Sequence, residues 1–351
     1  MILRLLRSAV LAGCALPACA APIIDMLGAS VPLTQPPQRV VTLPMPAAAL
    51  FLSIEPDATR LAGMHPNAQA LMQDGLLMRH FPSLRQVRSD VTRSGFAPNI
   101  ESLLLLQPDL IWQWGHMGDE LIAPLRQAGL PVAALRYGDD KQTRQWIALM
   151  GQAQDQQTRA KAQLQWRAAV RERVAAEVAS IPPGSRPGVL YLSRQQPQYR
   201  SAGAGSSTDE DIRLAGGRNV AARIGSAQAI GVEQILTWAP DVILLGNFDD
   251  GLTPEAIYAD PLLADLPAVR QRRVYKVPAG GYPWDPPSQE SPLYWEWLAM
   301  QLHPALPGWP LREHIRQAYQ QLYGLTVDAA QIDRVLHLPL NQEAAGYERL
   351  R

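Results

Sequence analysis

Short apolar runs alternate with longer stretches of helical spacing along most of the chain. A first group of runs lies at residues 40–43, 60–64, 110–114 and 132–135, and a second group lies at 189–192, 242–245 and 274–277. Alternation of this kind is typical of α/β domains that are built on a mostly parallel sheet. Because one segment of different character separates the two groups, the pattern predicts two α/β lobes.

The separating segment, residues 155–181, contains neither glycine nor proline, and its apolar residues repeat at helical spacing from Val170 to Ile181. We expect Asp155 to cap the start of a helix, and the Pro-Pro-Gly sequence at 182–184 to end it. Such a helix is about 40 Å long at 1.5 Å per residue, which is enough to bridge two lobes. A long helix packed on one large domain is the alternative interpretation.

An internal repeat relates the two halves of the chain. Shifting the sequence by 132 positions aligns residues 99–111 with residues 231–243. Both copies contain a glutamate, a Pro-Asp pair seven and eight residues later, and then an apolar strand. Proline ends the short helix and aspartate favours the turn, so each copy predicts a helix, a turn and a strand. Two similar lobes explain the repeat economically, and chance similarity of two such units is the alternative.

Composition narrows the possible functions. The chain has 351 residues, 47% of them hydrophobic, which is long enough for two ordinary domains. Its 32 basic and 32 acidic residues cancel, so no overall field attracts nucleic acid. The six histidines form no H-x-x-H pair, and the sequence has neither a nucleophile elbow nor a phosphate loop. We therefore predict no catalytic residue, no metal site and no cofactor.

The first twenty residues read as a secretory signal peptide. Two arginines precede an apolar stretch at residues 8–16, and small residues follow in an A-x-A pattern near position 20. Both cysteines, Cys14 and Cys19, lie within residues 1–20, so the exported chain has no thiol. A lipid anchor on Cys14 is the alternative, since Leu-Ala-Gly-Cys resembles a lipoprotein signal. We predict a periplasmic protein.

Five motifs in a fixed order carry a resemblance to a known family. They are Pro-Gln-Arg-Val-Val-Thr-Leu at 37–43, the first repeat at 98–111, Leu-Ala-Gly-Gly-Arg-Asn-Val at 214–220, the second repeat at 231–244, and Arg-Val-Tyr-Lys-Val-Pro at 273–278. In these motifs the chain resembles the class III periplasmic binding proteins of ABC importers for ferric siderophores, haem and cobalamin. The resemblance implies two Rossmann-like lobes joined by one rigid helix, with the ligand in the cleft between them.

The residue pattern and the resemblance together give the domain boundaries. We expect the signal peptide at residues 1–20, an N-terminal lobe at 21–154, the bridging helix at 155–181 and a C-terminal lobe at 182–351. The rigid helix predicts only small movements of the lobes when ligand binds.

The resemblance also implies a partner, the permease of an ABC importer in the inner membrane. The family's two docking glutamates, one on each lobe, fall on Glu101 and Glu233, which are equivalent positions of the repeat. Exposed carboxylates there would pair with arginines of the permease. Stabilisation of a helix N-terminus by each glutamate is the alternative. We predict a monomer that binds no nucleic acid.

Ligands of α/β proteins bind beyond the carboxyl ends of the strands, where this chain has many large side chains. Aromatic faces suit a bulky chelate, and arginines suit its oxygen atoms. The segment 284–293 leads into a helix, and caps from its serines could leave backbone N–H groups free for an anion. Each residue could equally be structural. We predict ligand contacts from Met45, His65, Trp114, His116, Tyr137, Arg200, Tyr282 and Trp284.

The sequence therefore predicts a periplasmic protein that delivers a metal chelate, a ferric siderophore first of all, to an ABC importer. Molybdate or tungstate, cobalamin, haem and a bare metal ion are alternative ligands. A chelatase-like enzyme of the same architecture is the alternative from another class of function, with His116 or Glu120 moving protons.

Overall fold

A computed structural model of the chain describes residues 22–73, 75–194, 198–306 and 308–351. The predicted signal peptide, with Cys14 and Cys19, lies outside the described residues and stays a prediction. Within the described ranges, no helix combines the length and the apolar character that crossing a membrane requires.

The N-terminal lobe is built on a parallel four-stranded sheet in the order β4-β3-β5-β6. Every residue of the central strand β5 is buried, as expected for a parallel sheet with helices on both faces. Before this sheet, β1 (Ile23–Ile24) and β2 (Ser30–Val31) form a short antiparallel pair. The sheet strands are β3 (Val40–Thr42), β4 (Leu61–Met64), β5 (Leu110–Trp114) and β6 (Val132–Leu135), and the helices of the lobe are α1 (Ala47–Ile54), α2 (Pro66–Met72), α3 (Leu76–His80), α4 (Ile100–Leu106), α5 (Ala123–Gln127) and α6 (Asp140–Ala153).

The C-terminal lobe has a second parallel sheet, in the order β12-β11-β7-β9. A separate antiparallel pair, β8 and β10, lies beside it. The strands are β7 (Gly188–Leu192), β8 (Tyr199–Ser201), β9 (Arg218–Asn219), β10 (Gln228–Ile230), β11 (Val242–Leu245) and β12 (Val274–Lys276), and the helices are α8 (Ser207–Leu214), α9 (Val232–Trp238), α10 (Pro254–Ala259) and α11 (Pro267–Arg270). The predicted two-lobed α/β fold is confirmed.

The repeat appears in both lobes as a helix followed by a central strand, α4 with β5 and α9 with β11. Both helices end at a residue in the left-handed conformation, Gln107 at φ 48° and Ala239 at φ 41°. The aspartates that follow both accept hydrogen bonds from the backbone at or just before the start of a neighbouring strand. Asp109 accepts backbone hydrogen bonds from the approach to β3, and Asp241 accepts one from Gly188 at the start of β7. The shared motif therefore ties each central strand to its neighbour.

The bridging helix α7 spans Gln157–Ala179. The expected cap at Asp155 is wrong, because Asp155 adopts a left-handed φ of 56° in the turn between α6 and α7. The helix therefore begins two residues later than predicted, and Gln156 precedes it without a side-chain cap.

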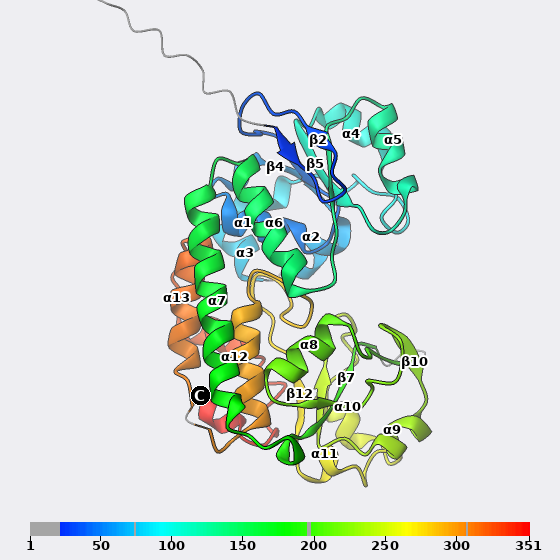
Figure 1. The fold of residues 1–351 in the computed structure, drawn as a ribbon, viewed down its shortest axis with the longest axis vertical. Coiled ribbons are helices and arrows are strands. Elements are labelled where there is room, and N and C mark those ends of the chain that lie inside the picture. The colour runs from blue at the N-terminus through cyan, green and yellow to red at the C-terminus, as the bar shows by residue number, and fades with distance from the viewer. Residues whose placement is uncertain (1–21, 74, 195–197, 307) are drawn as a thin grey trace, which may run out of the picture.

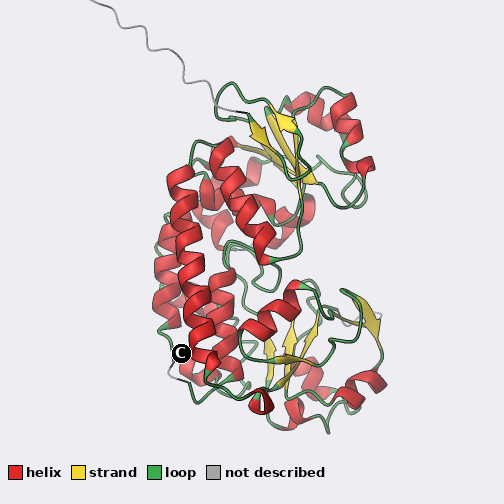
Figure 2. Ribbon diagram, in the orientation of Figure 1, coloured by secondary structure: helices red, strands yellow, loops and turns green. Residues whose placement is uncertain are grey.

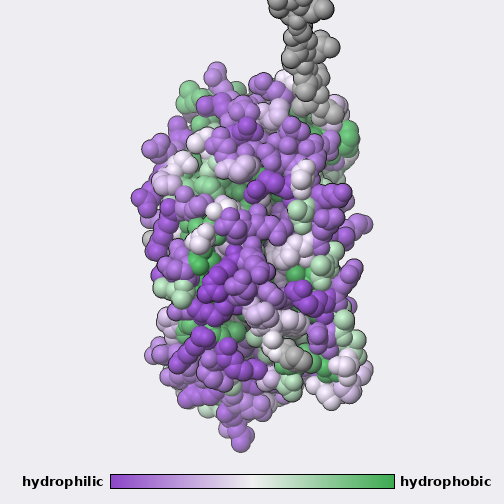
Figure 3. All heavy atoms as spheres, turned by 90° about the vertical axis from the view of Figure 1, so that its left-hand side faces the viewer, coloured by the Kyte–Doolittle hydropathy of each residue, from purple (hydrophilic) through white to green (hydrophobic). Residues whose placement is uncertain are grey.

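The bridge is wider than one helix. Two C-terminal helices, α12 (Ser291–Leu302) and α13 (Leu311–Tyr323), run beside α7, and we call these three the helical layer (Figures 1 and 2). Every residue of α12 is buried, so this helix needs cover on all sides, which α7 and α13 help to provide. Because α13 also packs on α1, residues 182–351 do not all belong to the C-terminal lobe, contrary to the predicted boundary. The outer face of the layer is mostly hydrophilic (Figure 3).

Candidate functional site

Aromatic rings gather at the carboxyl ends of the N-terminal strands. Trp114 ends β5, and its ring centroid lies 5.4 to 5.6 Å from the ring centroids of Phe96, His116 and Tyr137. The contacts continue from Phe96 to His65 and from Tyr137 to Trp146, at 4.9 and 5.3 Å. This is the end of the sheet where ligands of open α/β folds bind. The aromatic wall consists of His65, Phe96, Trp114, His116, Tyr137 and Trp146.

The structure thus brings together four of the predicted contacts, His65, Trp114, His116 and Tyr137. His65 is buried, and both ring nitrogens have backbone partners. Nδ1 accepts from Asn67 N–H at the start of α2, and Nε2 lies 3.1 Å from the Gly95 carbonyl oxygen. Burial lowers the pKa of His65, which favours a neutral ring that donates through Nε2. His65 therefore ties the loop at Gly95 to the start of α2. His116, by contrast, is exposed and makes an edge-to-face contact with Trp114.

Trp114 carries an unused donor. Its Nε1 atom is buried and has no hydrogen-bond partner within the described part of the chain. Edge-to-face contacts with Phe96 and His116, at interplanar angles of 86° and 90°, hold the indole in place. A buried N–H without an acceptor is costly. An acceptor supplied by a ligand would remove that cost.

The wall touches a long loop of the other half of the chain. We call residues 279–290, between β12 and α12, the cleft loop, which lies between the two lobes in Figure 1. The Tyr137 hydroxyl donates to the carbonyl oxygen of Pro287 at 2.7 Å. Burial raises the pKa of Tyr137 well above its usual range, and the neighbouring carboxyl of Asp285 adds to the effect. Tyr137 therefore stays a neutral donor at the junction of the lobes.

The C-terminal lobe contributes a polar cluster to the same place. Tyr191 near the end of β7 donates to Asp285 Oδ2 at 2.7 Å, and Asn247 just beyond β11 donates to Oδ1 at 2.8 Å. Gly246 has no room for a side chain, since an added Cβ would lie 2.5 Å from the Tyr191 hydroxyl. Burial raises the pKa of Asp285, although both hydrogen bonds and the charge of Lys276 oppose the rise. The cluster is therefore a tightly packed set of neutral donors around one carboxyl group.

The predicted contacts on the cleft loop are more enclosed than the sequence suggested. Tyr282 is 2% exposed, and burial together with Asp285 raises its pKa. Trp284 is fully buried, and its Nε1 donates to Glu290 at 2.7 Å. The structure therefore places Trp284 inside the protein instead of on an open cleft surface.

The last two predicted contacts are not members of the aromatic wall. Met45 is half-buried between Pro44 and Pro46 after β3, where it packs against the main core. Arg200 is exposed on β8, and its guanidinium donates to the carbonyl of Ala227. No contact among the described residues connects Arg200 with the aromatic wall.

Serine hydroxyls occupy two backbone N–H groups before α12, a segment for which the sequence left open an anion site or a purely structural role. Ser288 N–H donates to the Ser291 hydroxyl at 2.9 Å, and Glu290 N–H donates to the Ser288 hydroxyl at 3.2 Å. All three residues are buried. The N–H groups of Ser288 and Glu290 are therefore not open to a ligand, and the buried loop has a structural role.

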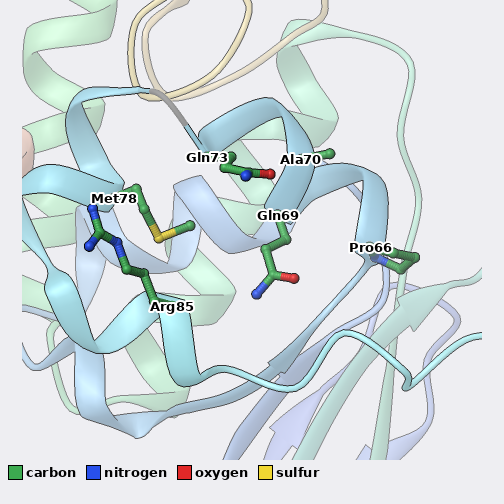
Figure 4. Close-up of a pocket in the computed structure, with 6 residues that line it drawn as sticks. All are labelled: Pro66, Gln69, Ala70, Gln73, Met78 and Arg85. Carbon is green, nitrogen blue, oxygen red and sulfur yellow. The ribbon is translucent and has the colours of Figure 1, made fainter.

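Beside the wall, the N-terminal lobe contains a cavity of about 460 Å³ (Figure 4). Its rim is mostly polar, with Met78 as its largest apolar side chain, and it lies between α2, α3 and the turn at Pro82–Gln86. None of the eight predicted contacts lines it. Its lining residues are Pro66, Gln69, Ala70, Gln73, Met78 and Arg85. Over the described ranges, no group of three or more His, Cys, Asp or Glu side chains could hold a metal ion.

The two predicted docking residues occupy matching places on the lobes. Glu101 and Glu233 are exposed in the first turns of α4 and α9. One turn further on, both helices expose leucine side chains, of which Leu105 is 73% exposed and Leu236 is 42% exposed.

Sequence reasoning did not select Phe96, Trp146, Tyr191, Asn247 or Asp285. Tyr191 and Asn247 could have been found, because both stand near the carboxyl ends of predicted strands. Nothing in their local sequence marks Phe96 and Trp146, which join the wall only through tertiary packing.

Comparison with known proteins gives a consistent result. The profile of a family described as periplasmic binding protein matches residues 87–280, more than half of the chain. The molybdate-binding protein MolA of Haemophilus influenzae is 26% identical over 248 residues, which cover 64% of this chain and 70% of MolA. A periplasmic solute binding protein of Veillonella parvula is 27% identical with a TM-score of 0.84, over 92% of this chain and 98% of that one. The molybdate-bound structure of MolA has a TM-score of 0.75 at 22% identity, over 88% of this chain and 99% of that one.

Proposed function

The chain belongs to the periplasmic binding protein family, and we propose that its cargo is a small oxyanion of the molybdate class. Its role as the periplasmic substrate-binding protein of an ABC importer follows from that family and its structural neighbours. The proposal concerns which ligand it carries and which residues hold that ligand.

The observation that carries the cargo proposal is the Trp114 N–H, which is buried at the carboxyl end of β5 without an acceptor. An oxyanion supplies an acceptor for this N–H, and the Tyr137 hydroxyl, which donates to Pro287 at the lobe junction, can turn to the ligand when that contact opens. The Tyr137–Pro287 hydrogen bond holds the lobes together there, so a small ligand needs only a small separation to enter. MolA, a relative of this chain, is named for binding molybdate.

A metal chelate such as a ferric siderophore is the second candidate. The observation that favours it is the extent of the aromatic wall, with the exposed Arg136 directly before Tyr137. Aromatic rings and a guanidinium suit a catecholate complex. Such a ligand is larger, so it would have to keep the lobes apart at the Tyr137–Pro287 contact.

Thermal unfolding of residues 22–351 tests the cargo. Molybdate, tungstate, sulfate and phosphate are compared with ferric siderophores, haem, cobalamin and nickel. A ligand at about 100 times its Kd adds about 2.7 kcal/mol to the stability of the folded state. We expect molybdate and tungstate to raise the melting temperature, whereas a rise with a ferric siderophore alone would overturn the oxyanion proposal in favour of the second candidate.

A pair of matched variants tests the site. Trp114→Phe removes the unused donor, and Trp112→Phe removes a second buried indole N–H without a partner from the same strand. Trp112 makes none of the ring contacts of the wall. We expect Trp114→Phe to weaken molybdate binding at least tenfold and Trp112→Phe to leave it within twofold. If the two substitutions have equal effects, Trp114 does not donate to the ligand.

A further inference from the structure

One buried carboxylate holds the cleft loop to the helical layer. Glu290 is fully buried, and each of its oxygens accepts two hydrogen bonds. From the loop, Gly281 N–H and Trp284 Nε1 donate at 2.8 and 2.7 Å. From α13, the hydroxyls of Tyr319 and Tyr323 donate at 2.9 and 2.6 Å. Glu290 thus joins the loop to α13 through four hydrogen bonds, and the neighbouring Gln289 amide adds one to the Tyr323 hydroxyl at 2.7 Å.

The backbone at Gly280 and Gly281 passes too close to Glu290 and the two tyrosines to allow a side chain. A Cβ on Gly280 would overlap the Tyr319 hydroxyl and Glu290 Oε2, and a Cβ on Gly281 would lie 2.6 Å from the Tyr323 hydroxyl and 2.7 Å from Glu290 Oε1. Neither glycine has a positive φ, so close approach, not backbone freedom, requires glycine here. The backbone at these two positions therefore packs directly against the Glu290 carboxylate.

The far side of the same loop meets the candidate site. The Pro287 carbonyl accepts from Tyr137 of the aromatic wall, and Asp285 accepts from Tyr191 and Asn247 of the C-terminal lobe. The next carbonyl, that of Ser288, accepts from Arg167 of α7 at 2.7 Å. The loop is thus fixed by Glu290 on one side and presents its polar groups to both lobes on the other.

We propose that Glu290 is a positioning residue of the cargo site, which sets ligand affinity by fixing the cleft loop without touching the ligand. This inference rests on the proposed function, because it takes Tyr137 and the Asp285 cluster as the place where cargo binds. Only a carboxylate can accept all four donors. In Glu290→Gln the amide nitrogen faces donors, so about two of them lose their acceptor in a buried position.

Titration calorimetry with sodium molybdate on residues 22–351 gives the main test. We expect Glu290→Gln to weaken binding at least tenfold and Glu290→Asp, which keeps the carboxylate, to recover part of the loss. The matched control is Tyr347→Phe, which removes the acceptor of the buried Trp297 N–H and one of the two donors to the Leu336 carbonyl, and leaves all four hydrogen bonds of Glu290 in place. It should lower the melting temperature and leave the affinity within twofold. An unchanged affinity in Glu290→Gln, or an equal loss in both variants, would overturn the inference.

Should Glu290→Gln fail to fold, Tyr319→Phe and Tyr323→Phe each remove one donor to Glu290 and keep the carboxylate, and Tyr323→Phe also removes the acceptor of the Gln289 amide. We expect each to weaken molybdate binding by a smaller factor, with more effect on affinity than the Tyr347→Phe control has. Unchanged affinity in both would contradict the positioning role.

Hydrogen exchange separates this inference from the cargo proposal, because it needs no ligand. In Glu290→Gln we expect faster exchange of the amides of Gly281 and Trp284 and of the segment after β6 that contains Tyr137. Exchange in β11 should be unchanged. If wild type binds no molybdate but these amides respond, the cargo proposal fails and the positioning role stands. If loop exchange is unchanged, the positioning role fails whatever the cargo is.

Discussion

Asp211 lies on α8 with 7% of its surface exposed, where α8 packs on the helical layer. Its Oδ1 accepts from Trp295 Nε1 at 2.6 Å. Arg167 is the cation that faces it, and Glu210 and Asp140 add negative charge nearby. Burial dominates these effects and raises the pKa of Asp211 to about 7. The substitution Asp211→Asn keeps an acceptor for Trp295 and removes the titration.

The size of the effect follows from the two pKa values. The carboxyl group has an ordinary pKa of 3.8 in the unfolded chain and about 7 in the folded one, so the folded state holds its proton more tightly. Stability from this group is fully present below pH 4 and is lost as the pH rises through 7. Complete ionisation costs about 4 kcal/mol, and the part lost between pH 5 and pH 8 is about 2.5 kcal/mol.

Urea denaturation of residues 22–351, followed by tryptophan fluorescence from pH 5 to pH 8, measures this loss. We expect the stability advantage of Asp211→Asn over wild type to grow by about 2.5 kcal/mol across that range. Other buried carboxyls titrate in both proteins, so the difference isolates Asp211. The control Glu172→Gln changes an exposed carboxylate of α7 and should run parallel to wild type. If the free energy of unfolding of Asp211→Asn also changes with pH in parallel with wild type, the reasoning is refuted.

Three further predictions follow from the lobes and the layer. The double variant Glu101→Lys, Glu233→Lys should abolish uptake in cells and leave cargo affinity unchanged; normal uptake would contradict the docking role. Asn341→Ala should lower the free energy of unfolding by about 2–4 kcal/mol in urea denaturation, because Asn341 pairs with both the N–H and the carbonyl of Lys276; a loss below about 0.5 kcal/mol would contradict this account. Small-angle scattering should show little compaction when molybdate is added, and a large decrease in radius of gyration would show that the layer bends.

The sequence predicted the lobes because periodicity and the repeat are local signals. The match between residues 99–111 and 231–243 encodes a helix, a left-handed end and a strand, and nothing distant is needed to form them. The start of α7 was predicted less well, since Asp155 has the chemistry of a cap but adopts a turn conformation with positive φ. The role of α13 could not be predicted, because its packing on α1 joins residues more than 250 positions apart.

Of the residues that meet at the candidate site, the predicted contacts cover mainly the N-terminal side. The rule that ligands bind beyond strand ends found Trp114 and Tyr137, each within two residues of the end of a strand. It selected Trp284 for its aromatic ring, yet that ring is fully buried and its N–H donates to Glu290. Which side of a loop faces a cleft depends on the partners of the whole loop, and the key partners here, Tyr319 and Tyr323, come from a helix later in the chain.

The two lobes offer different chemistry to one ligand, although they share a repeat. The repeated motif, α4-β5 and α9-β11, has the same two roles in both lobes. It links the central strand to its neighbour, and it carries the exposed glutamate, Glu101 or Glu233. The cleft residues lie beyond the repeat, where the N-terminal lobe supplies rings and the C-terminal lobe supplies hydroxyl, amide and carboxyl groups. In the proposed site a ligand between them would meet rings on one side and the Asp285 cluster on the other, and the cleft loop, held by Glu290, would determine how closely those two faces approach.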